Sequence, residues 1–105
     1  MNMNLEKFDS WLAEVNAARK EYWDSRFNYK PYEPLRVDMG RKYIRLWDRS
    51  SCWGFVSMVD GSNKGAPVKV GDLLRPASWK TPAKNSRGNI FDGTARWEYY
   101  GPSYM

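Results

Sequence analysis

The sequence predicts an α+β domain, in which an N-terminal amphipathic helix packs on a small, mainly antiparallel sheet. Residues 5–27 have a helical repeat of apolar side chains, and residues 41–48 alternate as a strand does, with further strand-like runs after them. A chain of 105 residues is long enough for one hydrophobic core but not for two. We therefore expect a single domain over residues 1–105, with the sheet and a long basic loop within residues 41–100.

The helix is predicted from apolar residues that recur at steps of three and four. Asn4 is a suitable N-cap, and Glu6 carries a negative charge in the first turn, where the helix dipole favours it. Because a marginal helix needs tertiary packing to persist, we expect the apolar face to lie across the sheet. That face contains Leu5, Phe8, Leu12, Val15, Ala18 and Tyr22, and it is widened by Trp11, Trp23 and Phe27.

A β-hairpin is predicted after the helix and an extended connection that contains Pro31, Pro34 and Gly40. The run "RKYIRLWD" alternates, and "SCWGFVSMV" follows after a short polar link. The alternation places Tyr43, Arg45 and Trp47 on one face and Lys42, Ile44 and Leu46 on the other.

A turn region, "DGSNKGAP", comes next, and "VKVGDLLRP" can form a third strand that is bent or bulged at Gly71. Residues 76–94 show neither period and are broken by Pro76, Pro82, Gly88 and Gly93. They predict a long irregular loop with one helical turn near Pro82–Asn85. The tail "ARWEYYGPSYM" predicts a last short strand and an aromatic end that packs on the same domain or, in a homodimer, on a second copy.

The net charge of +5 is concentrated in one segment. Residues 64–88 contain six basic residues and one acidic residue, and the charges of the rest of the chain cancel. Such a basic segment predicts an anionic partner, either nucleic acid or a phosphorylated ligand. No long basic amphipathic helix accompanies it, so a membrane surface is not expected.

Catalysis is not expected. The chain has no histidine and one cysteine, Cys52, which excludes disulfides, the usual zinc sites and imidazole chemistry. Cys52 lies in an apolar run and is expected to be structural. Asp60, Asp72 and Asp92 each adjoin a glycine, as turn aspartates do. We predict no cofactor and no metal.

The N-terminal "MNMNLEKF" has no signal-peptide character, and no apolar run is long enough to span a membrane, so a reducing cytoplasm is the expected compartment.

The candidate binding site combines cations with aromatic rings, which is typical of proteins that hold single-stranded nucleic acid. Two alternatives stay open: the lysines can serve solubility alone, and Arg87, Gly88 and Asn89 can have a structural role in which Gly88 supplies a positive φ. The candidates are Arg75, Trp79, Lys80, Lys84, Arg87, Gly88 and Asn89, with Tyr43, Arg45 and Trp47 added if their strand face is open.

Three stretches carry a resemblance to a known group of proteins: "GRKYIRLW", "CWGFVSMVDG" and "ASWKTPAKNSRGNIFD". Together they resemble, over about residues 40–92, a family of small uncharacterised proteins of tailed bacteriophages. That family has a Gly-x-Lys-Tyr strand and a Trp-Lys-x-Pro-Ala-Lys-x-x-Arg-Gly-Asn block. The resemblance implies phage origin, the host cytoplasm and a small sheet with an N-terminal helix, and it implies no activity. It also implies that Lys80, Pro82, Ala83, Lys84, Arg87, Gly88 and Asn89 form one unit.

These observations lead to the hypothesis that the protein is a non-catalytic phage accessory protein that binds nucleic acid. The expected form of that nucleic acid is a single strand. The alternative is a small inhibitor of a host factor, which docks on a host protein or sequesters a signalling nucleotide. A minor virion component is a third reading.

Overall fold

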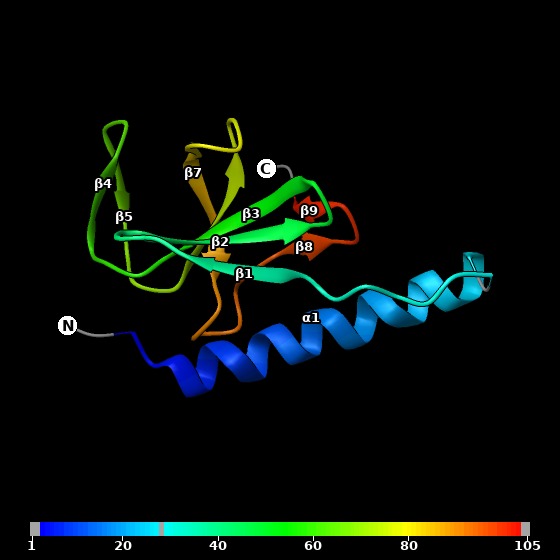
Figure 1. Cartoon of the computed structure of the whole chain (residues 1–105). Helices are drawn as coiled ribbons and strands as arrows, with labels where there is room; N and C mark the ends of the chain where they lie inside the picture. The colour runs from blue at the N-terminus through cyan, green and yellow to red at the C-terminus, as the bar shows by residue number, and fades with distance from the viewer. Residues whose placement is uncertain (1–2, 28, 104–105) are drawn as a thin grey trace.

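One helix and a five-stranded antiparallel sheet form the body of the molecule, which confirms the α+β prediction (Figure 1). The computed structural model describes residues 3–27 and 29–103. The ends of the predicted domain 1–105 and the last two residues of the predicted aromatic tail lie outside them. The sheet has the order β1-β2-β3-β6-β7, with β1 Arg36–Met39, β2 Tyr43–Asp48, β3 Ser51–Ser57, β6 Asp72–Pro76 and β7 Pro82–Asn89. Two small hairpins pair β4 Gly61–Asn63 with β5 Ala66–Val68, and β8 Trp97–Glu98 with β9 Gly101–Pro102.

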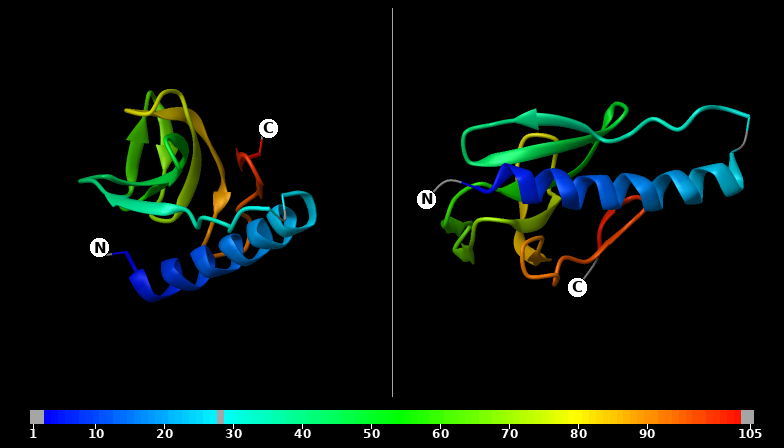
Figure 2. Two further views of the ribbon diagram at one scale, coloured as in Figure 1. Left: turned by 45° about the vertical axis from the view of Figure 1, so that its right-hand side comes forward. Right: turned by 90° about the horizontal axis from the view of Figure 1, so that it is seen from below.

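Helix α1 (Leu5–Arg26) begins where the sequence predicts. The Asn4 side chain caps it by accepting a hydrogen bond from the Lys7 backbone N–H at 3.0 Å. Its buried side chains are Phe8, Trp11, Val15 and Arg19, whereas Leu5 is 49% exposed and Ala18 is exposed. The predicted apolar face was therefore wrong at these two residues. The helix lies obliquely under the sheet, and its C-terminal turns extend past the strands (Figure 2), so periodicity alone does not decide which side chains are covered.

The predicted hairpin is confirmed as β2 and β3, joined by a tight turn in which Arg49 has a φ of 57°. Ile44 and Leu46 of β2 are fully buried in the core that faces α1. The alternate residues of β2 lie on the opposite face and are half-buried. A register shift after Leu46 lets Trp53 turn into the core, where its ring lies 6.5 Å from that of Trp11.

The prediction of a long irregular loop over residues 76–94 was wrong for its central part. Residues 82–89 form β7, which pairs with β6, and the expected helical turn near Pro82–Asn85 is part of this strand. β7 lies at the edge of the sheet, where a proline at the first residue and a glycine near the end of a strand are tolerated. Its pairing with β6 has two register shifts, and these remove the alternation of apolar and polar residues that would have predicted a strand.

The other strand boundaries also differ from the prediction. Arg36–Met39, expected to be an extended connection, pairs with β2 as the edge strand β1. The turn region after β3 is the β4–β5 hairpin. The predicted third strand over residues 68–76 is divided: Val68 belongs to β5, residues 69–71 connect it to β6, and Gly71 in this connection has a φ of 91°. The tail forms two short strands instead of one, and it packs on its own chain: the Tyr99 carbonyl accepts hydrogen bonds from Arg19 and Trp53.

The sheet face opposite α1 is covered over part of its area. Phe55 and Leu74, cross-strand partners on this face, are almost completely buried. The β4–β5 hairpin packs near β7, where Asn63 Nδ2 donates to the Ala83 carbonyl at 2.7 Å. The β2 end of the face remains partly exposed, and the candidate site lies there. Within residues 3–27 and 29–103, no helix is long and apolar enough to cross a membrane.

Candidate functional site

The outer face of β2 carries an alternating row of rings and cations. Tyr43, Arg45 and Trp47 project from it because Ile44 and Leu46 take the opposite side into the core. Neighbouring strands extend the row: Phe55 of β3 lies opposite Arg45, and Arg36 of β1 lies opposite Trp47. The Arg36 guanidinium carbon lies 5.4 Å from the centroid of Trp47, within cation–π range.

Arg45 is at the centre of this cluster. Its Nη1 forms an ion pair with Asp38 Oδ2 of β1 at 3.0 Å. Its guanidinium carbon lies 5.7 Å from the ring centroids of Trp47 and Phe55 and 5.8 Å from that of Trp79. The packing holds the guanidinium between three rings, while its Nε is buried and has no hydrogen-bond partner among the described residues.

Trp79 reaches Arg45 from the β6–β7 turn, far along the chain. The turn is fixed by Ser78, whose Oγ accepts hydrogen bonds from the backbone N–H groups of Lys80 and Thr81, at 3.1 Å and 3.3 Å. The Trp79 side chain is 56% exposed, and Lys80 Nζ lies 5.2 Å from its ring centroid. An exposed indole can stack on a flat aromatic ligand, while the cations on its border can hold an anionic group of the same ligand. We call this region the β2–Trp79 surface; it consists of Arg36, Tyr43, Arg45, Trp47, Trp79 and Lys80.

A pocket of about 190 Å³ adjoins the β2–Trp79 surface at the turn between β1 and β2. The turn is tight: the Gly40 N–H donates to the Tyr43 carbonyl at 3.0 Å, and a Cβ on Gly40 would lie 2.8 Å from that oxygen. Lysine and arginine side chains dominate the charged lining. The lining residues are Asp38, Gly40, Arg41, Lys42, Tyr43, Arg45, Phe55 and Lys80.

The structure thus brings together five of the ten predicted site residues and places the other five elsewhere. Pro76 pairs with Pro82 beside the Trp79 turn, whereas Asp72 pairs with Asn89 at the opposite end of the β6–β7 hairpin. Tyr43, Arg45, Trp47, Trp79 and Lys80 form the cluster; Arg75, Lys84, Arg87, Gly88 and Asn89 do not belong to it.

Gly88 and Asn89 have structural roles where they lie. Gly88 has a φ of 93°, and a Cβ there would lie 2.0 Å from the Thr94 carbonyl oxygen. The Asn89 amide donates to the Val70 carbonyl at 2.8 Å and to Asp72 at 3.0 Å, and its Oδ1 accepts from the Phe91 N–H. These contacts close the loop that follows β7. They therefore support the structural interpretation of Gly88 and Asn89 in the Arg-Gly-Asn motif.

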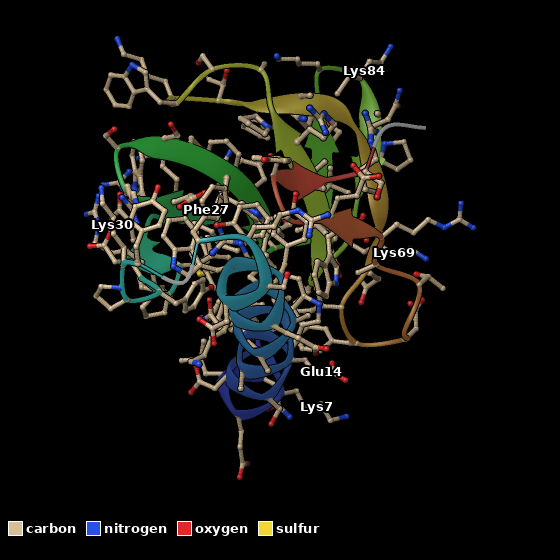
Figure 3. All side chains as sticks on the ribbon, turned by 90° about the vertical axis from the view of Figure 1, so that its right-hand side faces the viewer. Lys7, Glu14, Phe27, Lys30, Lys69 and Lys84 are labelled. Carbon is tan, nitrogen blue, oxygen red and sulfur yellow. The ribbon has the colours of Figure 1, made fainter. Side chains whose placement is uncertain are left out.

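The remaining predicted cations are spread over other surfaces. Arg75 donates to the Pro102 carbonyl of β9. Arg87 Nη1 donates to the carbonyl of Asn85, in its own strand, at 2.6 Å. Lys84 is exposed, and Figure 3 shows it together with Lys69 on the side of the molecule away from Lys30. The basic segment 64–88 is therefore divided between two hairpins and does not form one loop.

The structure adds residues that the sequence reasoning missed: Arg36, Asp38, Arg41, Lys42 and Phe55. The alternation of Arg36 and Asp38 across Val37 was the available signal for β1, but the prolines before it favoured an extended connection. The sequence shows Phe55 only as one apolar residue in a strand. Its position opposite Arg45 depends on the β2–β3 register, which the sequence does not give.

The groups considered for catalysis are a partly buried thiol and carboxylates that accept hydrogen bonds in turns. Burial raises the pKa of the Cys52 thiol, so the group is protonated at neutral pH. Asp60 and Asp72 accept backbone N–H groups of the loop between β5 and β6. A hydrogen bond from the Thr94 hydroxyl lowers the pKa of Asp92. Over residues 3–27 and 29–103, no three His, Cys, Asp or Glu side chains are grouped as metal ligands would be.

Comparison with known proteins gives a match to a family but no function. The model of DUF7717, a family of unknown function, matches residues 7–103, which is almost the whole chain. No curated protein and no solved structure matches.

Proposed function

The chain belongs to DUF7717, a family of unknown function, and we propose that it is a non-catalytic protein that binds single-stranded nucleic acid through the β2–Trp79 surface. The observation that carries this proposal is the gathering of Trp79, Lys80 and the outer face of β2 around Arg45. Stacking of one base on an aromatic side chain contributes about 1–3 kcal/mol, and it depends little on base identity. Trp79, more than half exposed, is the first candidate for such a contact.

Cations around these rings supply the contacts to phosphate. Arg36, Arg41 and Lys42 are exposed, as is Lys80 next to Trp79. Four such contacts on a single strand predict a slope of about −3 in log K against log salt concentration, at about −0.7 for each contact. Affinity should therefore fall steeply with salt and vary little with sequence.

We also propose that the protein is encoded by a tailed bacteriophage and acts in the host cytoplasm as an accessory protein. The support is the resemblance of "GRKYIRLW", "CWGFVSMVDG" and "ASWKTPAKNSRGNIFD" to a family of small phage proteins.

The test is a fluorescence-anisotropy titration of a labelled single-stranded oligonucleotide at low and at near-physiological salt. Changing Trp79 and Lys80 together to Ala should weaken binding by about 10- to 100-fold, which corresponds to loss of one stacked base and one phosphate contact. Circular dichroism should be unchanged, because both side chains are exposed.

A matched control is the double change of Lys84 and Arg87 to Ala. It removes two cations of β7 that lie outside the β2–Trp79 surface. Binding that survives this change but not the Trp79/Lys80 change supports the proposed surface. No binding by the wild-type protein at low salt would refute the proposal.

A second candidate, docking on a host protein as an inhibitor, is favoured by the aromatic end of the molecule. Tyr29 and Tyr100 are 72% and 75% exposed. Nearby, Trp23, Phe27 and Tyr99 help line a pocket of about 340 Å³. A pull-down from host extract that yields one stoichiometric protein, lost on the double change Tyr29→Ala/Tyr100→Ala but not on Trp79→Ala, would support this candidate.

A further inference from the structure

The pocket at the β1–β2 turn is strongly basic. Arg41, Lys42, Arg45 and Lys80 line it together with Asp38, an excess of three positive charges among these five side chains. The four cations come from three segments of the chain, namely the β1–β2 turn, β2 and the β6–β7 turn. Such convergence of like charges is unfavourable unless water or an anion screens it, so the pocket is suited to an anion.

The size of the pocket limits what it can hold. At about 190 Å³ it is smaller than the roughly 300–1,000 Å³ of pockets that enclose a whole small molecule. A single anionic group fits this space better than a complete nucleotide does. A phosphomonoester carries about −1.5 to −2 charges at neutral pH, whereas each phosphate inside a strand carries one. An excess of three positive charges therefore favours the monoester.

We propose that this pocket binds a terminal phosphomonoester, so that the protein recognises the phosphorylated end of a single strand. The inference rests on the proposed binding of nucleic acid and adds to it a preference for chain ends. Arg45 connects the two functions, because it lines the pocket and its guanidinium carbon also lies 5.8 Å from the Trp79 ring. The terminal phosphate would enter the pocket while the adjoining base stacks on the β2–Trp79 surface.

Asp38 and Arg45 give the proposal a sharp test. The Asp38 carboxylate lines the pocket and holds Arg45 Nη1 at 3.0 Å, so a phosphate must compete with it. The buried Nε of Arg45, which has no partner among the described residues, shows that this pair does not satisfy the whole guanidinium. Replacing Asp38 by Asn removes the opposing charge and should strengthen phosphate binding.

The experiment compares three oligonucleotides of one sequence, with a 5′-phosphate, with a 3′-phosphate, or with hydroxyl groups at both ends. The wild-type protein should bind one phosphorylated form about 10-fold more tightly than the hydroxyl form. Lys42→Ala should reduce this ratio to near 1, and Asp38→Asn should increase it several-fold. Lys84→Ala, which removes an exposed cation outside the pocket, should leave the ratio unchanged.

The outcomes separate the two proposals. Equal binding of all three oligonucleotides overturns the end preference and leaves the nucleic-acid proposal standing, whereas no binding of any of them overturns the nucleic-acid proposal itself. A ratio that is unchanged in Lys42→Ala and falls in Asp38→Asn shows that the pocket does not take the terminal phosphate. A nucleoside 5′-monophosphate that binds as tightly as the oligonucleotide identifies a free nucleotide as the ligand and overturns the recognition of strand ends.

Discussion

Arg19 is a cation in the middle of the buried face of α1. Its side chain is 1% exposed, and it makes an ion pair with Asp48 at 2.8 Å. It also donates to the Tyr99 carbonyl at 3.1 Å and to the Tyr32 hydroxyl at 2.8 Å. Burial raises the pKa of Tyr32, and its hydroxyl donates a hydrogen bond to Asn16 Oδ1. One guanidinium thus ties the helix to the connection before β1, to β2 and to the tail.

Changing Arg19 to Met should lower the free energy of unfolding by about 3 kcal/mol, because it leaves the partners of a buried cation unpaired. The estimate is at the low end for such pairs, since the Asp48 side chain is 26% exposed and water can solvate it. Urea denaturation measures the change. Lys20→Met is the control: its ion pair with Asp24 is exposed, and its loss should cost less than 0.5 kcal/mol. Similar effects of the two changes would contradict the structural role of Arg19.

Gly88 and Gly93 form a matched pair for the Arg-Gly-Asn motif. Both have a positive φ, at 93° and 78°, but a Cβ on Gly93 has no heavy atom within 4 Å, whereas one on Gly88 meets the backbone of Thr94 and Ala95. Gly93→Ala should therefore cost about 1 kcal/mol for its conformation, and Gly88→Ala about 1–3 kcal/mol more for the clash. Thermal unfolding checks the difference. If the two changes lowered the free energy of unfolding equally and only Gly88→Ala lost ligand binding, Gly88 would be a binding residue.

At the level of elements, β7 determines how the predicted site divides. Had residues 76–94 formed a loop, the segment could have presented Trp79, Lys84 and Arg87 on one surface. As a strand paired with β6, it holds Trp79 near β2 at one end and places Asn89 beside Asp72 at the other. The pairing also explains why the charge excess of residues 64–88 does not act as a single patch.

Hydrogen–deuterium exchange over residues 83–89 tests this strand. Backbone N–H groups that are bonded to β6 should exchange clearly more slowly in the protein than in a synthetic peptide of the same sequence. Protection should be partial, because β7 is an edge strand and part of its backbone faces solvent. Exchange at the rate of the free peptide throughout would restore the loop prediction.

For the whole molecule, the C-terminal tail closes the structure against the helix and the sheet. Tyr99 stacks on Tyr22 of α1 with centroids 4.5 Å apart, and Pro102 is almost completely buried. A Cβ on Gly54 of β3 would lie 2.9 Å from the Pro102 ring, so the glycine allows the close approach of the tail. Tyr99 and Pro102 of the tail thus pack on their own chain, and the homodimer stays a prediction.

Removing residues 99–105 should lower the unfolding midpoint by an amount that does not depend on protein concentration. The truncation removes the acceptor shared by Arg19 and Trp53 and the Pro102 packing on Gly54. The measurement is thermal unfolding at two concentrations that differ 50-fold or so, for both chains. A midpoint of the intact protein that rises with concentration, and no longer does so in the truncated chain, would show instead that the tail joins two copies.

The sequence by itself determined the helix, its Asn4 cap, the β2–β3 hairpin and the split of β2 into a buried and an outer face. These features depend on neighbours within a few residues, whose periodicity and capping can be read along the chain. Only the tertiary structure decided that residues 82–89 pair with β6, that Arg19 is buried, and that Trp79 and Lys80 lie beside Arg45 while Arg87, Gly88 and Asn89 do not. The physical reason is that edge-strand register and ring packing are set by partners far away in the chain, and the energy of those contacts overrides local breaks such as Pro82 and Gly88.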